Sequence, residues 1–242
     1  MSLRSFRSAV AFLTVVPVAD AGGDPGERLG RAYFPAVGAF VGLAAGCVFV
    51  LASALASPFV AAVAAVATGA VLTGGLHLDG LADSADGLLG GGDRERCLEI
   101  MRDPRVGSFG AIALALVLLG GVAALSAMTP ARAFAGLIAA GALSRLAMLA
   151  VVALLPYARP AGLGTAAQGQ RRVLDLVVGC LLTVIACTLN VRRSLVAALL
   201  VALTTVVVAG LARRRIGGAT GDVYGACTEV GQLAALLAFA AH

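Results

Sequence analysis

The sequence predicts an all-α polytopic integral membrane protein, a helical bundle of about seven transmembrane helices with interfacial helices beside them. Hydrophobic residues make up 60% of the 242-residue chain, and the mean hydropathy is +0.97. Only 13% of the residues are charged, so an ordinary soluble protein is excluded. Apolar runs near the roughly 20 residues that a helix needs to cross a bilayer recur along the chain. No long linker separates these runs, and residues 1–242 are expected to form a single transmembrane catalytic domain.

Seven apolar runs are the expected membrane-spanning helices. The first contains Gly38, Gly42 and Gly46 at intervals of four, which either allows close helix contact in lipid or reflects the abundance of glycine in membrane helices. Ser57-Pro58 predicts a tight turn after it. The fifth and seventh runs are short for a full crossing. The expected spans are 33–56, 59–77, 106–127, 131–155, 173–190, 194–212 and 226–241.

The basic residues indicate the orientation of these spans. All 18 are arginine, and most lie in the N-terminal segment and in the loops 78–105, 156–172 and 213–225. Because positively charged loops tend to stay in the cytoplasm, this side of the protein is expected to be cytoplasmic. The same loops hold most of the polar chemistry, as expected for a catalytic face on a membrane scaffold. The net charge of +5 fits this topology and anionic ligands, and no nucleic-acid-binding motif accompanies it.

The N-terminal segment allows two interpretations. Arg4 and Arg7 precede a short apolar run, 9–19, which ends in the small-residue triplet Ala19-Asp20-Ala21 and resembles a signal peptide. Pro17 and the many later spans instead favour a short interfacial or re-entrant helix, which is the expected structure.

The segment HLDGLADSADG, residues 77–87, carries Asp79, Asp83 and Asp86 at intervals of four and three. On an α-helix these three carboxylates fall within an arc of about 60° and span about 10 Å of the axis. Like charges one turn apart repel, so a helix at a membrane boundary that keeps all three is expected to bind a cation. Oxygen ligands without clustered His or Cys favour Mg²⁺ or Mn²⁺ completed by phosphate oxygens. The alternative is a solvated helix end in a cytoplasmic loop.

A second polar segment, MRDPRVGSFG at residues 101–110, follows in the same loop. Polar and apolar residues alternate at helical spacing before it, which predicts a surface helix that Pro104 ends. Arg102 and Arg105 offer forked donors to a phosphate group, and Asp103 between them is assigned with them to substrate binding. The alternative is a positively charged membrane anchor with a proline turn.

Two later loops carry further candidates. Arg159 stands in PYARPAGLG, residues 156–164, between proline and glycine. The sequence RRRIGGATGD, residues 213–222, leads to Asp222 and then to Glu229, seven residues or about two helical turns further on. Asp222 and Glu229 are therefore expected to share a helix face, and the glycine-rich approach to Asp222 suits close contact with a ligand. The three consecutive arginines are expected to be topology anchors.

Two polar residues adjoin or lie within apolar runs. Arg145 falls inside the fourth expected span, where an unpaired guanidinium costs at least a few kcal/mol, so its side chain is expected to face the bundle. His77 stands two residues before Asp79 and is a candidate proton acceptor. A lone histidine at a helix end is more often simply hydrogen-bonded.

Ordered motifs along most of the chain resemble one family. GGLHLDGLADSADG from Gly74 is similar to the signature of the cobalamin synthase family, membrane enzymes that are adenosylcobinamide-GDP ribazoletransferases. The segments FLTVVP, YFPAVG, MRDPRVGSFG, the loop from Arg159 to Gly164 and TGDVYG resemble family segments in the expected order. Pro104 departs from the pattern, where a small polar residue is expected.

This resemblance implies the activity and the site. Ribazole, or its 5′-phosphate, is transferred to adenosylcobinamide-GDP with release of GMP, at the bacterial cytoplasmic membrane and with the active-site loops in the cytoplasm. The expected partners are these substrates and the lipid bilayer, without nucleic acid; a homo-oligomer is compatible with the sequence. The residues expected to hold Mg²⁺ are Asp79, Asp83, Asp86 and Asp222. The expected substrate-binding residues are Arg102, Asp103, Arg105, Arg159 and Glu229. The expected catalytic residues are His77 and Asp83, either of which would accept the ribose hydroxyl proton.

Two other functions remain as alternatives. A CDP-alcohol phosphotransferase also uses clustered aspartates and Mg²⁺, but its motif has an Ala-Arg pair after the first Asp-Gly and two later aspartates four apart, which this sequence lacks. A cation transporter would place acids near the middle of several spans, whereas here they cluster at span ends beside arginines.

Overall fold

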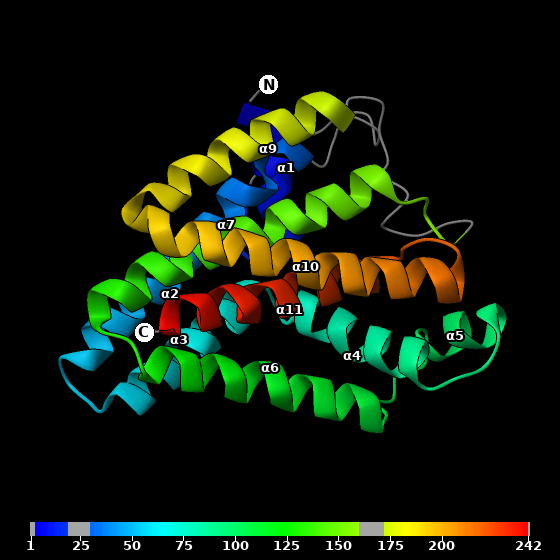
Figure 1. Cartoon of the computed structure of the whole chain (residues 1–242), viewed down its shortest axis with the longest axis horizontal. Helices are drawn as coiled ribbons and strands as arrows, with labels where there is room; N and C mark the ends of the chain where they lie inside the picture. Colours follow the sequence, from blue (N-terminus) through cyan, green and yellow to red (C-terminus); the bar gives the residue numbers. More distant parts are fainter. Residues whose placement is uncertain (1–2, 19–29, 160–171, 242) are drawn as a thin grey trace.

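The computed structural model describes residues 3–18, 30–159 and 172–241, and these residues fold into an elongated bundle of helices (Figure 1). The all-α fold class is confirmed. The signal-peptide triplet at 19–21 and the loop residues 160–164 lie outside the described residues. The α-helices are α1 (Leu3–Leu13), α2 (Phe34–Ser53), α3 (Pro58–Leu72), α4 (Leu76–Leu89), α5 (Arg94–Ile100), α6 (Ser108–Ser126), α7 (Pro130–Leu154), α9 (Arg172–Cys187), α10 (Val191–Ile216) and α11 (Gly221–Ala240).

Five helical segments in the described part of the chain are long and apolar enough to cross a membrane, and a bent pair of helices is a candidate for a sixth crossing. One of the five, Val173–Ile216, runs through 44 residues and contains both α9 and α10. Figure 1 shows α10 turning back from the end of α9, so this segment holds two of the seven predicted spans. The multi-pass architecture is therefore confirmed.

The span predicted over 59–77 is not one continuous helix, because α3 ends at Leu72 and α4 leaves it at 89°. Gly74 and Gly75 have φ angles of 60° and 73°, a left-handed conformation that glycine adopts without the cost of a side chain. Their N–H groups donate to the carbonyls of Val71 and Ala70, which closes the end of α3. Because of this bend, the aspartate-bearing helix α4 runs at nearly a right angle to α3.

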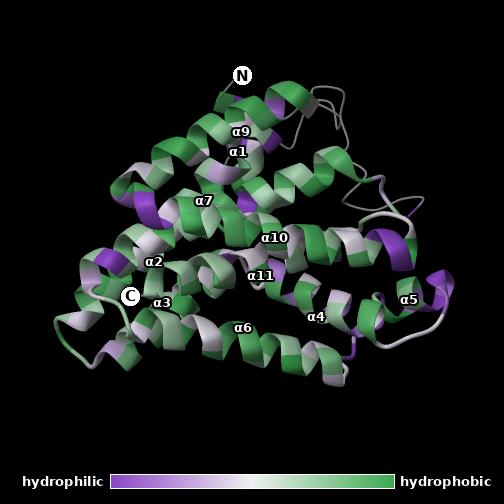
Figure 2. Cartoon of the chain, viewed as in Figure 1, coloured by the Kyte–Doolittle hydropathy of each residue, from purple (hydrophilic) through white to green (hydrophobic). Residues whose placement is uncertain are grey.

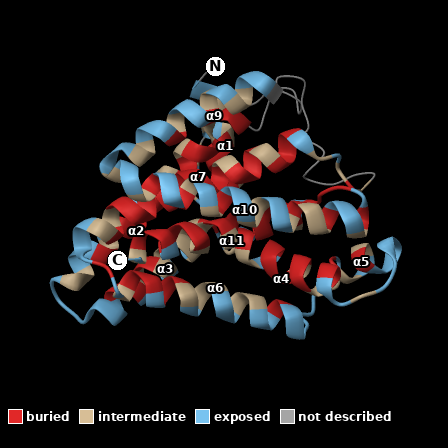
Figure 3. Ribbon diagram, viewed as in Figure 1, coloured by how far each residue is buried: buried red, intermediate tan, exposed pale blue. Residues whose placement is uncertain are grey.

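Glycines bring α2 and α7 into backbone contact at the centre of the bundle. A Cβ placed on Gly38 would lie 2.1 Å from the Gly141 carbonyl oxygen, and one on Gly42 would lie 2.1 Å from the Leu137 carbonyl oxygen. The glycine repeat of the first span is therefore a helix-contact surface. Figure 3 shows α7 as the most continuously buried helix, whereas α9 and α10 expose much of their length.

The polar loops gather at one end of the bundle, at the right of Figure 2. This end holds α5, the end of α10 and the starts of α6 and α11 (Figure 1). The described parts of the predicted loops, 78–105, 156–159 and 213–225, thus lie toward one end of the bundle. The helix α1 is amphipathic, with Ala9, Val10 and Leu13 buried and its polar face exposed, as expected for an interfacial helix.

Replacing Gly141 with alanine is expected to lower the thermal unfolding midpoint of the detergent-solubilised protein. The added Cβ would lie 2.1 Å from the Gly38 carbonyl oxygen, and separating two packed helices costs about 1–3 kcal/mol. Gly210→Ala is the matched control, since a Cβ there meets nothing within 4 Å. Equal unfolding midpoints for the two variants would contradict the proposed helix contact.

Candidate active site

The aspartate helix α4 is fixed against α11 by two glycines. A Cβ on Gly80 would lie 2.9 Å from the Asp222 carbonyl oxygen, and one on Gly225 would lie 2.9 Å from the His77 carbonyl oxygen. This backbone contact brings Asp222 close enough to Asp79 and Asp83 for the carboxylates to interact electrostatically. From the sequence these carboxylates could be placed only on the same side of the membrane, because the contacts made by Gly80 and Gly225 are not visible in it.

Arg159 and Asp222 form an ion pair across two loops. The Arg159 Nη2 to Asp222 Oδ2 distance is 2.8 Å, and the two side chains are 14% and 20% exposed. The Thr220 hydroxyl donates to the same carboxylate oxygen at 3.1 Å. The loop that carries Arg159 is held by two backbone hydrogen bonds, from Ala158 N–H to the Ala219 carbonyl (2.8 Å) and from Ala219 N–H to the Pro156 carbonyl (2.9 Å). The predicted phosphate ligand and the predicted metal ligand are therefore partners of each other.

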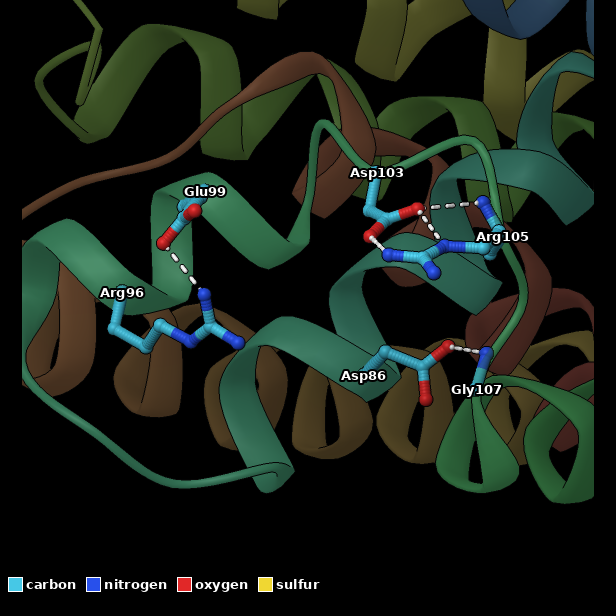
Figure 4. Close-up of polar contacts among 6 residues, drawn as sticks. All are labelled: Asp86, Arg96, Glu99, Asp103, Arg105 and Gly107. Carbon is cyan, nitrogen blue, oxygen red and sulfur yellow. Dashed lines mark hydrogen bonds and ion pairs between the residues drawn. The ribbon is translucent and has the colours of Figure 1, made fainter.

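Asp86 connects α4 to the start of α6. Its Oδ2 accepts from the Gly107 N–H at 2.7 Å, the contact drawn in Figure 4, and its Oδ1 accepts from the Gly110 N–H at 2.9 Å. The carboxylate thus satisfies two of the N–H groups that a helix start leaves unpaired, and its charge suits the positive end of the helix dipole. A Cβ on Gly110 would lie 2.4 Å from Asp86 Oδ2, so glycine is needed for this approach.

Asp79 and Asp83 differ from the other two carboxylates. Among the residues that the structure describes, neither side chain has a hydrogen-bond or ion-pair partner. Asp79 is exposed and Asp83 is half-buried, one turn apart on the same face of α4. No three His, Cys, Asp or Glu side chains within the described ranges lie close enough together to form a metal site. A pair of unpartnered carboxylates still fits Mg²⁺, which commonly uses one or two carboxylates and completes its shell with water and phosphate oxygens.

The segment before α6 holds its own ion pair. Arg105 donates to both oxygens of Asp103, at 2.9 and 2.7 Å (Figure 4). The Arg105 guanidinium lowers the pKa of the exposed Asp103 carboxyl to about 2, so the pair is ionised at physiological pH. The Arg102 side chain is exposed and has no partner among the described residues, which leaves it available to an anion.

Arg94 is a positioning residue that the sequence analysis missed. Its Nε donates to the Ile216 carbonyl at 3.0 Å and its Nη2 donates to the Ala158 carbonyl at 2.8 Å. One side chain thus joins the start of α5 to the end of α10 and to the loop that carries Arg159. Nothing in the sequence distinguishes this arginine from its neighbours, because both acceptors are backbone atoms.

Two predicted residues lie inside the bundle. His77 is 1% exposed, and neither ring nitrogen has a hydrogen-bond partner among the described residues. Glu229 lines an internal cavity of about 50 Å³ together with Arg145 and Gln232. Arg145 donates to Gln232 Oε1 at 2.6 Å and is 2% exposed, so the prediction that it faces the bundle is confirmed. Glu229 lies two helical turns, about 10 Å, along α11 from Asp222.

Comparison with known proteins identifies the family. A family model described as cobalamin-5-phosphate synthase matches residues 5–240. The chain belongs to this family. Relatives named adenosylcobinamide-GDP ribazoletransferase include those of Bradyrhizobium diazoefficiens, 40% identical over 99% of this chain and 94% of the relative, and Pseudomonas syringae, 43% identical over 97% and 98%. The relative from Chlorobaculum tepidum is 40% identical over 95% and 92%.

Membership of the cobalamin synthase family confirms the resemblance seen in the sequence motifs, and neither the CDP-alcohol phosphotransferase nor the transporter interpretation is favoured. No solved structure matches the chain.

Asp86→Asn tests whether this carboxylate is a helix cap or a metal ligand. The asparagine amide oxygen can still accept a hydrogen bond from one of the two N–H groups, so we expect the unfolding free energy to fall by about 1 kcal/mol. The Mg²⁺ concentration for half-maximal activity is expected to change less than threefold. Gly110→Ala, which obstructs the same contact, is expected to reproduce the stability loss. A Mg²⁺ requirement raised tenfold or more in Asp86→Asn alone would instead make Asp86 a metal ligand.

Proposed function

We propose that the polar end of the bundle joins ribazole, or its 5′-phosphate, to adenosylcobinamide-GDP in the last steps of cobalamin synthesis. A ribose hydroxyl oxygen forms a bond to the cobinamide-side phosphorus, the bond from that phosphorus to the GMP oxygen breaks, and GMP leaves. The hydroxyl proton passes to a carboxylate. The family supplies the reaction class, and the carboxylates and arginines supply a chemistry suited to it.

The observation that carries the proposal is the pair Asp79 and Asp83. Neither carboxylate has a side-chain partner among the described residues, whereas Asp86 accepts hydrogen bonds from backbone N–H groups and Asp222 is paired with Arg159. Two adjacent negative charges at a membrane boundary call for a cation. We propose that Asp79 and Asp83 hold Mg²⁺, with Asp222 as a further candidate ligand. When bound, Mg²⁺ would neutralise the charge that develops on the diphosphate.

Arginines around the pair would bind the phosphates. Arg102 is exposed, and its side chain has no partner among the described residues. Arg159 is paired with Asp222 through Nη2 at 2.8 Å, and its other N–H groups can donate to a phosphate oxygen. Arg105 donates to Asp103 through two of its nitrogens and keeps further donors for substrate. The loop that carries Arg159 meets the segment that carries Arg102 and Arg105, because Arg159 Nη2 also donates to the Met101 carbonyl at 3.4 Å.

Asp83 is the better placed of the two proton acceptors. It is half-buried and lies within electrostatic range of Asp79, Asp86 and Asp222, a grouping that favours proton uptake by one member. His77 is 1% exposed, so its ring is buried inside the protein. We therefore assign the proton to Asp83 and keep His77 as the second candidate.

The proposed setting is the bacterial cytoplasmic membrane, with the polar end of the bundle in the cytoplasm. Eight of the 18 arginines belong to the described segments of this end, in agreement with the tendency of positive charge to remain inside: Arg94, Arg96, Arg102, Arg105, Arg159, Arg213, Arg214 and Arg215. The nucleotide-linked substrate and the GMP product are water-soluble anions, which suits a site that opens to the cytoplasm.

Asp83→Asn is expected to reduce GMP release from adenosylcobinamide-GDP and ribazole 5′-phosphate at least 100-fold, because it removes both a metal ligand and the proton acceptor. The assay uses purified protein in lipid with Mg²⁺, and EDTA should abolish the wild-type activity until Mg²⁺ or Mn²⁺ is restored. Asp93→Asn is the matched control, since Asp93 caps α5 by accepting from the Arg96 N–H and asparagine caps equally well. Full activity of Asp83→Asn, or turnover of a CDP-linked lipid in place of this substrate pair, would refute the proposal.

A further inference from the structure

An open groove lies beside the bend between α3 and α4 and along the first turns of α4. It encloses about 710 Å³, which is within the range of pockets for small organic ligands. We call it the bend groove. Its lining residues come from the end of α1, the bend, the first turns of α4 and one face of α6: Phe12, Thr14, Val15, Thr73, Gly74, Gly75, Leu76, Leu78, Asp79, Ala82, Val106, Leu114 and Leu118.

The polar groups of the bend groove are already engaged as donors. The Thr14 hydroxyl donates to the Val10 carbonyl at 2.8 Å, and the Thr73 hydroxyl donates to the Gly69 carbonyl at 2.9 Å. The Val15 N–H donates to the Leu72 carbonyl at 2.9 Å, which pins the end of α1 to the bend. The N–H groups of Gly74 and Gly75 are likewise bonded within the turn. A ligand in this groove would find apolar walls and few hydrogen-bond donors.

Charge distinguishes the bend groove from the loops around it. Among the described residues that line the groove, Asp79 is the charged one and none is an arginine. A diphosphate lying along the groove would find no arginine on these described walls to offset its charges, which is unfavourable. The arginines that suit phosphate, Arg102 and Arg159, belong to the loops near Asp83 and Asp222 instead.

We infer that the bend groove binds the benzimidazole base of the ribazole substrate, with the ribose directed toward Asp79 and Asp83; this inference rests on the proposed function. Guanine carries amide and amino groups on its edges, and their burial without partners costs free energy. The corrin ring is edged with amides and makes the same demand. The benzimidazole base has an apolar edge, and it is the part of either substrate that an apolar groove without free donors can accept.

The order of groups along α4 fits this assignment. On α4 the groove is lined from Leu76 to Ala82, and Asp83 is the next residue, one turn or about 6 Å along the axis from Asp79 and within electrostatic range of Arg159 and Asp222. If the base lies in the groove, the ribose attached to it would place its hydroxyl group next to Asp79 and Asp83. The phosphate-binding arginines would then lie on the far side of these carboxylates from the base. The 5′-phosphate of a phosphorylated ribazole would lie outside the groove.

Leu114→Trp tests the inference, because Leu114 is a half-buried groove residue of α6 and the larger side chain would occupy the space of the base. We expect the KM for ribazole to rise at least tenfold while the KM for adenosylcobinamide-GDP changes less than twofold. Val106→Trp, at another part of the wall, should act in the same direction. Leu116→Trp is the matched control on the same helix, at an exposed position outside the groove, and should leave both constants unchanged.

The chain contains no tryptophan, so each variant also carries a single indole whose emission reports binding without turnover. We expect ribazole to alter the emission of Leu114→Trp at high concentration and to leave that of Leu116→Trp unchanged. Unchanged KM values, together with an emission of Leu114→Trp that ribazole does not alter, would overturn the inference and leave lipid as the occupant of the groove. A raised KM for adenosylcobinamide-GDP alone would also overturn it. If the wild-type protein released no GMP but ribazole still altered the emission of Leu114→Trp, the proposed function would be refuted and ribazole binding in the bend groove would stand.

Discussion

The backbone contact between α4 and α11 determines where the candidate catalytic groups lie. At Gly80 and Gly225 the two helices approach so closely that a single methyl group on either would meet the other helix at 2.9 Å. Side chains at this crossing would hold the helices further apart and would move Asp83 away from Asp222 and Arg159. The bend at Gly74 and Gly75 then sets the angle at which α4 reaches the crossing. The site is therefore built from backbone contacts, and the carboxylates are placed by glycines that carry no chemistry themselves.

Four carboxylates at one place repel one another, and the structure divides them between two roles. Asp86 accepts two backbone N–H groups at the start of α6, and Asp222 is paired with Arg159. Their charges are offset within the protein, which holds the surrounding loops in position. Asp79 and Asp83 remain without partners in the described part of the chain. This part of the protein thus keeps one pair of carboxylates without a partner, and this pair is where we propose that a cation binds together with the diphosphate of the substrate.

Much of this arrangement could be predicted from the sequence, because hydropathy, arginine placement and the spacing of Asp79, Asp83 and Asp86 are local properties. The break in the second span was missed, although the adjacent glycines Gly74-Gly75 were a visible signal. The roles of Asp86 and Arg94 could not be predicted, because both side chains bind backbone atoms of distant segments. Every residue type has these backbone groups, so the sequence does not indicate which of them are bound. Glu229 shares a helix with Asp222, as expected, but two turns of α11 carry it into the bundle beside Arg145.

The most direct test of this account is the rate of GMP release by Gly80→Ala, measured in lipid beside its unfolding midpoint. A Cβ at this position would lie 2.9 Å from the Asp222 carbonyl oxygen, so the two helices must shift by a few tenths of an ångström. Because catalytic geometry tolerates little displacement, we predict a rate lowered at least tenfold with the protein still folded, whereas Gly69→Ala, where a Cβ meets nothing within 4 Å, keeps the wild-type rate. A wild-type rate in Gly80→Ala would contradict the claim that this contact sets the geometry of the site.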